Sequence, residues 1–268
     1  MRLKIRHQTV YRYSAPVLRS IQSLRLTPRS DRRQTIRTWK LDLPAAAPTY
    51  ADAYGNLTQL LTLEGLHEEI RIGVEGVVEM IDDPPPESRD EALSPLIFLR
   101  ETPLTAADAR LAGFSEELKE PIQADPAAAL DLLMERIRAA VRYVKGTTHV
   151  QTTAAEVLSQ GSGVCQDHSH LFIACCRILG VPARYVSGYL YSGTEADPEV
   201  ATHAWAEAWI DGAGWRSFDV SNGWPAGPAH LRLAIGRDYL EACPIRGIRF
   251  GGGDETLEVH VQVMTEQQ

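Results

Sequence analysis

The sequence predicts an α+β protein in which an antiparallel β domain precedes a core of helices followed by strands. Apolar and polar residues alternate through residues 1 to about 80, whereas beyond residue 105 the apolar spacing is first that of helices and then again that of strands. Between these parts lies Asp82–Ser88, an acidic, proline-rich stretch that continues neither pattern. We therefore assign a β-sandwich-like domain to residues 1–82, a connection to 83–104 and the core to 105–268.

The first domain is predicted from alternation and turn residues. Its clearest alternating run comprises Ile70, Ile72, Val74, Val78 and Met80. Turn-forming residues such as those of Tyr54-Gly55-Asn56 separate such runs, which is typical of a small antiparallel sandwich or barrel. No cluster of residues suited to catalysis occurs in this part of the sequence.

The core begins with three predicted helices. Asp125-Pro126 supplies an N-cap and a first-turn proline for the first helix, and Thr153-x-x-Glu156 is a capping box that opens the second. The third starts near Cys165 and ends at Gly180. Predicted strands follow at residues 183–191, 203–210, 215–220 and 257–263.

Composition excludes several classes of function. A net charge of -8 and a pI near 5.5 argue against a nucleic-acid-binding protein, which needs a basic face. The sequence has no run of 18 apolar residues and its first residues lack the apolar stretch of a signal peptide, so we expect no membrane span. Four cysteines without the spacing of a disulfide framework favour a reducing, cytoplasmic location. The oligomeric state is left open.

Cys165 is the candidate nucleophile. It follows Gly161-Ser162-Gly163-Val164 and stands at the start of the third helix. The backbone N–H groups and the dipole of a helix start favour a thiolate, and the same N–H groups can hold an oxyanion. Cysteine is also a common buried residue. That explanation suits Cys175 and Cys176 on an apolar helix, but it fits Cys165 poorly because Gln166, Asp167 and His168 follow it.

His203 and Asp219 are the candidate base and orienting acid. His203 lies in an alternating strand, and Asp219 ends the next strand after the turn Asp211–Gly214. A hairpin of these strands would place the two side chains together, so that the carboxylate fixes the imidazole tautomer. A lone histidine is more often structural, and Cys, His and Asp occur in this order in many chains, so spacing alone leaves the assignment open.

These residues lie in motifs that resemble bacterial transglutaminase-like proteins. The motifs of the core are Gly163-Val164-Cys165-Gln166-Asp167, Leu179-Gly180-Val181-Pro182-Ala183-Arg184-Tyr185-Val186-Ser187-Gly188-Tyr189, His203-Ala204-Trp205-Ala206-Glu207, Gly214-Trp215-x-x-Phe218-Asp219 and Gly236-Arg237-Asp238-Tyr239. The first domain resembles the β domain that often precedes this core, through His7-x-Thr9-x-Tyr11-x-Tyr13, Leu24-Arg25-Leu26-x-Pro28-Arg29 and Asp52-x-Tyr54-Gly55-Asn56. The resemblance covers nearly the whole chain.

The resemblance implies a papain-like transglutaminase core with a catalytic triad of Cys165, His203 and Asp219. Such proteins are described as cysteine proteases, amidases or acyl transferases, so the implied reaction is acyl transfer at an amide bond of a protein or peptide. Hydrolysis through a thioester is the leading expectation. Transamidation to an amine is one alternative, and a peptide-binding module without catalysis is another.

No cofactor and no metal is expected. His168 and His170, with Cys165 and His203, form a possible metal set, but Cys-x-x-His-x-His is not a zinc spacing. The sequence departs from the commoner family pattern at His168-Ser169 and at Val220-Ser221. These departures bear on the details of the pocket. Glu207 is expected to be a buried or semi-buried carboxylate paired with an arginine, with Arg184 as one possible partner, and Arg237 and Asp238 are expected to form an ion pair.

Overall fold

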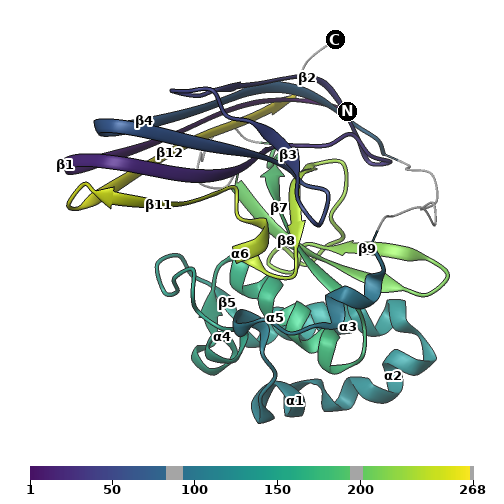
Figure 1. Ribbon diagram of the computed structural model, residues 1–268. Coiled ribbons are helices and arrows are strands. Elements are labelled where there is room, and N and C mark those ends of the chain that lie inside the picture. Colours follow the sequence, from purple (N-terminus) through teal and green to yellow (C-terminus); the bar gives the residue numbers. More distant parts are fainter. Residues whose placement is uncertain (83–92, 194–201, 266–268) are drawn as a thin grey trace.

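The computed structural model describes residues 1–82, 93–193 and 202–265, so residues 83–92 of the predicted connection lie outside the described residues. A long antiparallel sheet covers one end of the core, and the smaller sheet of the core lies between it and the helices (Figure 1). The start of the first strand and the end of the last strand of this sheet lie side by side, with Leu3 opposite Thr265. In the described part of the chain, no helix combines the length and apolar character needed to cross a membrane.

The long sheet has six strands. They are β1 (Arg2–Thr27), β2 (Gln34–Asp42), β3 (Thr49–Ala51), β4 (Leu57–Met80), β11 (Ile245–Gly251) and β12 (Glu255–Thr265). β12 and β11 follow one another along the edge of β1, with Leu3 opposite Thr265 and Leu24 opposite Ile245. Residues 245–265 were assigned to the core, and the structure corrects this. Alternation reveals which face of a strand is buried, but it does not reveal the strand beside it.

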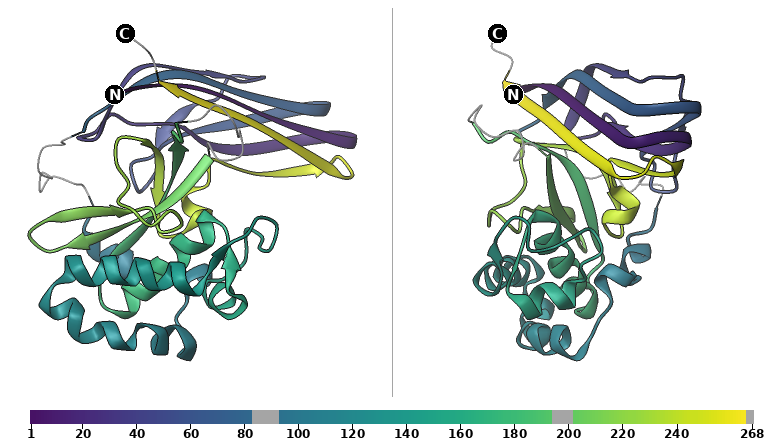
Figure 2. Two further views of the ribbon diagram at one scale, coloured as in Figure 1. Left: turned by 180° about the vertical axis from the view of Figure 1, so that it is seen from behind. Right: turned by 90° about the vertical axis from the view of Figure 1, so that its left-hand side faces the viewer.

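A single bent sheet provides the two layers that the sequence suggested. The pairing of β1 with β4 is interrupted between Arg12 and Val17, and the long strands curve back at the end of the sheet farthest from the start of β1 (Figures 1 and 2). Leu3 and Ile5 before the bend share one buried cluster with Leu24 and Leu26 after it. Leu231 of the core sheet belongs to the same cluster, so the core closes part of the β domain.

The core consists of short helices and a four-stranded antiparallel sheet. Its α-helices are α1 (Ala109–Ser115), α2 (Lys119–Ala124), α3 (Pro126–Ala140), α4 (Ala154–Gln160), α5 (Cys165–Ile178) and α6 (Tyr239–Ala242). Its 3-10 helices are η1 (Pro95–Leu99), η2 (Pro103–Thr105) and η3 (Glu116–Leu118). The sheet has the order β10 (His230–Gly236), β7 (Ala183–Leu190), β8 (Thr202–Ile210), β9 (Gly214–Phe218), and a separate short pair joins β5 (Arg142–Tyr143) to β6 (Ser162–Gly163).

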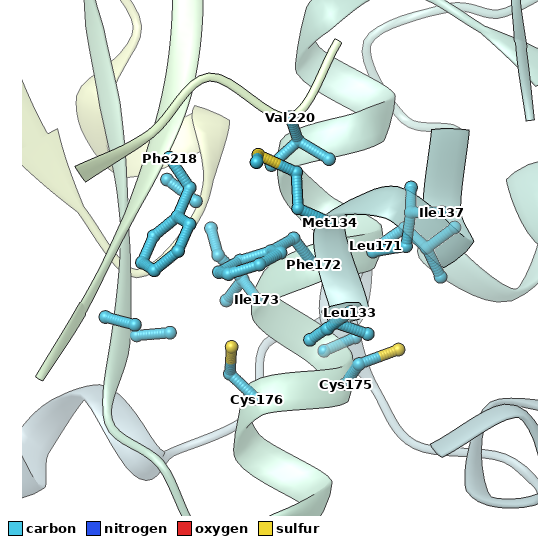
Figure 3. Packing of buried hydrophobic residues seen from close by; sticks show 14 of the residues in the cluster. Leu133, Met134, Ile137, Leu171, Phe172, Ile173, Cys175, Cys176, Phe218 and Val220 are labelled. Atoms are coloured by element: carbon cyan, nitrogen blue, oxygen red, sulfur yellow. The ribbon is translucent and has the colours of Figure 1, made fainter. Parts of the chain in front are cut away.

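Helix α5 lies at the centre of the core, and its residues Asp167–Arg177 are all buried. Figure 3 shows Phe172 and Ile173 of α5 beside Phe218, and Leu171 beside Ile137 of α3. The strand β8 meets α5 with Ala204, Ala206 and Ala208, and these small side chains let the helix approach the sheet closely. Packing on all sides therefore fixes the position at which α5 begins.

Two side-chain amides join the β domain to the outer edge of β10. Gln34 accepts a hydrogen bond from the Arg232 N–H (2.9 Å) and donates to the Arg232 carbonyl (2.9 Å). Asn56 does the same to Ile235, at 2.9 Å and 2.8 Å. Each amide takes the place of a neighbouring strand at an edge that would otherwise leave backbone groups unpaired. The β domain thereby fixes the strand that begins at His230.

Candidate active site

Cys165 is the first residue of α5, and hydrogen bonds hold the turn that leads into it. Asp167 Oδ2 accepts from the Val164 N–H and from Thr148 Oγ1, both at 2.7 Å, and His168 Nδ1 contacts the Val164 carbonyl at 2.9 Å. A Cβ atom on Gly163 would lie 2.7 Å from the Cβ of Asp167, so only glycine allows this approach. The glycine before this helix therefore leaves room for the Asp167 carboxylate, which caps the start of α5.

His203 and Asp219 meet as the predicted hairpin requires. β8 and β9 pair antiparallel from Ala206 opposite Phe218 to Ile210 opposite Gly214. His203 lies near the beginning of β8 and Asp219 directly after β9, so both side chains stand at the same end of the hairpin. His203 Nε2 is 2.9 Å from Asp219 Oδ2, and the two side chains are only 6% and 0% exposed. The ring nitrogen Nδ1 is thereby left to face another group.

The charges around His203 favour its protonated form. Burial lowers the pKa of His203, but the hydrogen bond to Asp219 and the interaction with Cys165 outweigh burial and raise that pKa to about 10. Burial raises the pKa of Asp219, and the hydrogen bonds from His203 and His230 outweigh it and hold that pKa well below its usual range. Asp219 and Cys165 are thus the two groups that favour the protonated form of His203.

His230 is a fourth member of this cluster, and the sequence analysis did not identify it. Its Nε2 lies 2.8 Å from Asp219 Oδ2, the oxygen that also contacts His203. Asn222 Nδ2 donates to the same oxygen at 2.8 Å, and Ser221 Oγ contacts Asp219 Oδ1 at 3.2 Å. The unusual Ser221 after the aspartate therefore contacts the carboxylate. No spacing rule links His230 to Asp219, although a histidine at the start of an alternating strand could have marked it.

The histidines do not assemble in the way that the metal alternative required. His168 Nε2 contacts the Val141 carbonyl at 3.0 Å, and His170 Nε2 accepts from the Tyr239 N–H at 3.0 Å. A different group, His203, Asp219 and His230, offers ligand atoms within 4.8 Å of one another. Its internal contacts of 2.8 Å and 2.9 Å have the length of hydrogen bonds. These residues could hold a metal ion only by giving up the hydrogen bonds that orient His203.

Exposed apolar side chains lie on segments that contact the neighbours of Cys165 or the backbone of Asp219. Tyr143 pairs with Gly163, Val144 donates its N–H to the Gly163 carbonyl, and Gln166 reaches the Val150 carbonyl. The side chains of Tyr143, Val144 and Val150 are exposed. The side chain of Trp224 is also exposed, and its backbone carbonyl accepts a hydrogen bond from the Asp219 N–H. We call Tyr143, Val144, Val150 and Trp224 the apolar rim.

A second buried polar network lies farther along β8. Glu207 pairs with Arg184 at 2.7 Å, as the sequence analysis expected, and Arg232 lies 3.5 Å from the same carboxylate. The expected pair of Arg237 with Asp238 is wrong. Arg237 binds Glu241 one helical turn later, because Asp238 is the N-cap of α6 and accepts the Glu241 N–H.

The chain is similar to known proteins over nearly its whole length. The pattern of the Transglutaminase-like superfamily matches residues 116–220, and that of the Bacterial transglutaminase-like N-terminal region matches residues 3–79. An uncharacterized protein of Mycobacterium leprae is 32% identical, over 98% of both chains, and one of Mycobacterium tuberculosis is 31% identical, over 98% of this chain and 92% of its own. The crystal structure of a "Putative Cysteine Protease" from Cytophaga hutchinsonii shares the fold, with a TM-score of 0.75 at 22% identity over 100% of this chain and 91% of that one.

Proposed function

The chain belongs to the transglutaminase-like superfamily, and on that premise we propose that it hydrolyses an amide bond through a thioester on Cys165. The predicted fold class is confirmed: an antiparallel β domain is followed by a papain-like, transglutaminase-type core. In this proposal Cys165 is the nucleophile, His203 the base and acid, and Asp219 the residue that orients His203.

One observation carries the proposal. The imidazole of His203 binds Asp219 through Nε2 and interacts with Cys165, and its pKa is raised to about 10 even though burial alone lowers it. A buried imidazolium persists only beside negative charge, which Asp219 and a thiolate supply together. A histidine with a purely structural role has no need of a thiol as its second partner.

The proposed reaction has two steps. The thiolate of Cys165 attacks the amide carbonyl, the imidazolium of His203 gives its proton to the leaving amine, and a thioester forms. His203 then takes a proton from water, the hydroxide attacks the thioester, and the acid and the thiol are released. The first N–H groups of α5 have no acceptor within the helix, so they are suited to hold the oxyanion of both intermediates.

The proposed substrate is a protein or peptide. The apolar rim is exposed on segments that contact Gly163, Gln166 and Asp219, and it suits apolar side chains that flank the scissile bond of a peptide. A reducing cytoplasm is the proposed compartment, because Cys165 must remain a thiol and none of the four cysteines is paired.

The first test is the rate at which an alkylating reagent modifies Cys165 as a function of pH, measured by peptide mass spectrometry. Cys175, Cys176 and Cys243 are buried and serve as internal controls. We expect rapid modification of Cys165 near pH 6, where an ordinary thiol with a pKa of about 8.5 is almost fully protonated. We also expect His203→Ala to slow it. If Cys165 reacts as an ordinary thiol in both proteins, the proposal is contradicted. The alternative of a peptide-binding module without catalysis would then stand.

A second measurement separates hydrolysis from transamidation. Peptides are incubated with the protein with and without a primary amine, and the product masses are compared. Cleavage or deamidation without the amine supports hydrolysis. A product that carries the amine at a glutamine, with little hydrolysis beside it, would replace hydrolysis by the transamidase alternative.

A further inference from the structure

We infer that His230 is a positioning residue of the active site, which holds the Asp219 carboxylate in the orientation that His203 needs. This inference rests on the proposed function, since it concerns the same triad. It adds a residue from β10, an edge strand of the core sheet, to a cluster otherwise built from α5, the β8–β9 hairpin and the residues that directly follow β9.

The first argument is the sharing of one oxygen atom. Asp219 Oδ2 receives contacts from His203 Nε2 (2.9 Å), His230 Nε2 (2.8 Å) and Asn222 Nδ2 (2.8 Å). A carboxylate rotates freely about its last bond unless its surroundings fix it. Three nitrogen donors that converge on Oδ2 fix the rotation, so that this oxygen stays directed at His203.

The second argument is that His230 can act only as a donor toward Asp219. The Gly227 N–H donates to His230 Nδ1 at 3.1 Å, so Nδ1 is the acceptor nitrogen of the ring and the proton lies on Nε2. Nε2 in turn faces Asp219. The backbone of the 227–230 turn thus selects the tautomer, as a second partner does for histidines that orient a reacting group.

The third argument is that the ring of His230 is rigidly held. Its side chain is 4% exposed, and Trp205 packs edge-on against it with ring centroids 5.3 Å apart. Two residues later, Gln34 of the β domain binds both backbone groups of Arg232. The β domain therefore positions His230, and through Asp219 it positions His203. The role of the β domain thus includes support of the triad.

The test uses two variants that separate the two nitrogens of the ring. Asparagine at this position reaches about as far as Nδ1 and can keep the contact with Gly227, whereas glutamine reaches about as far as Nε2 and can still donate to Asp219. We expect His230→Asn to slow alkylation of Cys165 by iodoacetate, an anion that the imidazolium attracts, about tenfold near pH 7. We also expect it to move the alkaline limit of this pH profile below that of the parent. We expect His230→Gln to recover most of the rate.

The control is His7→Gln, which changes another buried histidine with two side-chain partners, Tyr189 (2.6 Å) and Thr9 (2.8 Å), outside the active site. We expect this variant to have a lower melting temperature than the parent but the same pH profile of alkylation. The His230→Asn change is also made in an Asp219→Asn protein. Because His230 acts through Asp219, we expect no further slowing there.

The outcomes are distinct. A parent-like profile in His230→Asn, or an equal slowing in His7→Gln, overturns the positioning role while the proposed function stands. Full additivity of His230→Asn with Asp219→Asn also overturns it, because the effect would then not pass through the carboxylate. A parent protein whose Cys165 reacts as an ordinary thiol overturns the proposed function together with this inference.

Discussion

Strand β8 contributes to two buried polar networks, one that contains a titratable histidine and one that joins a carboxylate to arginines. Their residues on β8, His203 and Glu207, are four positions apart. At one end, His203 joins Asp219, His230 and Asn222, and the charge of the cluster depends on protons that an imidazole can gain or lose. Farther along, Glu207 is held between the permanently charged Arg184 and Arg232. Both networks are buried, so burial does not distinguish a reactive cluster from a structural one. The distinguishing feature is a titratable partner that faces a nucleophile.

The largest expected effect is that of Cys165→Ala, which tests the reactive cluster directly. We expect activity to fall below detection, because no other group in the cluster can form the thioester. The melting temperature should stay close to that of the parent, since Cys165 is only partly buried and alanine suits a helix start. Turnover of substrate by this variant at the parent rate would remove the cluster from consideration as the active site.

Asp219→Asn is expected to lower the rate by about 10² to 10⁴, less than the loss of the nucleophile, because His203 remains but is no longer oriented. The pH profile sharpens this prediction. The ion pair of His203 is complete below its ordinary pKa of 6.5 and is lost as the pH rises through about 10. Alkylation of the parent by iodoacetate, whose carboxylate the imidazolium attracts, should therefore decline only near pH 10. In the variant the decline should begin closer to pH 6.5, and an unchanged limit would show that Asp219 does not set the charge of His203.

The structural network should respond in the opposite way. Glu207→Gln leaves the side chain of Arg184, 3% exposed, without its carboxylate, and we expect a loss of about 3–5 kcal/mol in the free energy of unfolding. In the fraction of the protein that stays folded, Cys165 should still be alkylated at the parent rate. Glu75→Gln is the control, because Glu75 pairs with Arg6 at the surface and should contribute at most about 1 kcal/mol. Urea titration measures both.

The same network has its own pH dependence. Burial raises the pKa of Glu207, but Arg184 and Arg232 outweigh it and lower that pKa to about 2. Its contribution to stability is present above its ordinary pKa of 4.5 and is lost as the pH falls through about 2. A difference in stability between the parent and Glu207→Gln that stays constant as the pH falls from 4.5 to about 2 would contradict this assignment.

The contrast also explains what the sequence could predict. Cys165, His203 and Asp219 lie within local motifs, and the hairpin that joins the last two is a short-range structure, so their meeting follows from turn and strand patterns. His230 reaches Asp219 through the pairing of β10 with β7, which depends on packing and not on local sequence. The same limit explains β11 and β12. The alternation of residues 257–263 predicts β12 but not β11, and the pairing of both strands with β1 joins parts of the chain that are far apart in the sequence.

The smallest expected effect concerns the rim of the site. Trp224 is 51% exposed, and its backbone is paired with Asp219, so its side chain is free to contact substrate without holding the triad. We expect Trp224→Ala to raise KM for a peptide with an apolar residue beside the scissile bond about fivefold and to leave kcat unchanged. Tyr50→Ala is the control, since Tyr50 is similarly exposed (47%) but lies on β3 of the β domain. A fall in kcat with an unchanged KM would mean that Trp224 instead supports Asp219, and it would move this residue from the rim into the reactive cluster.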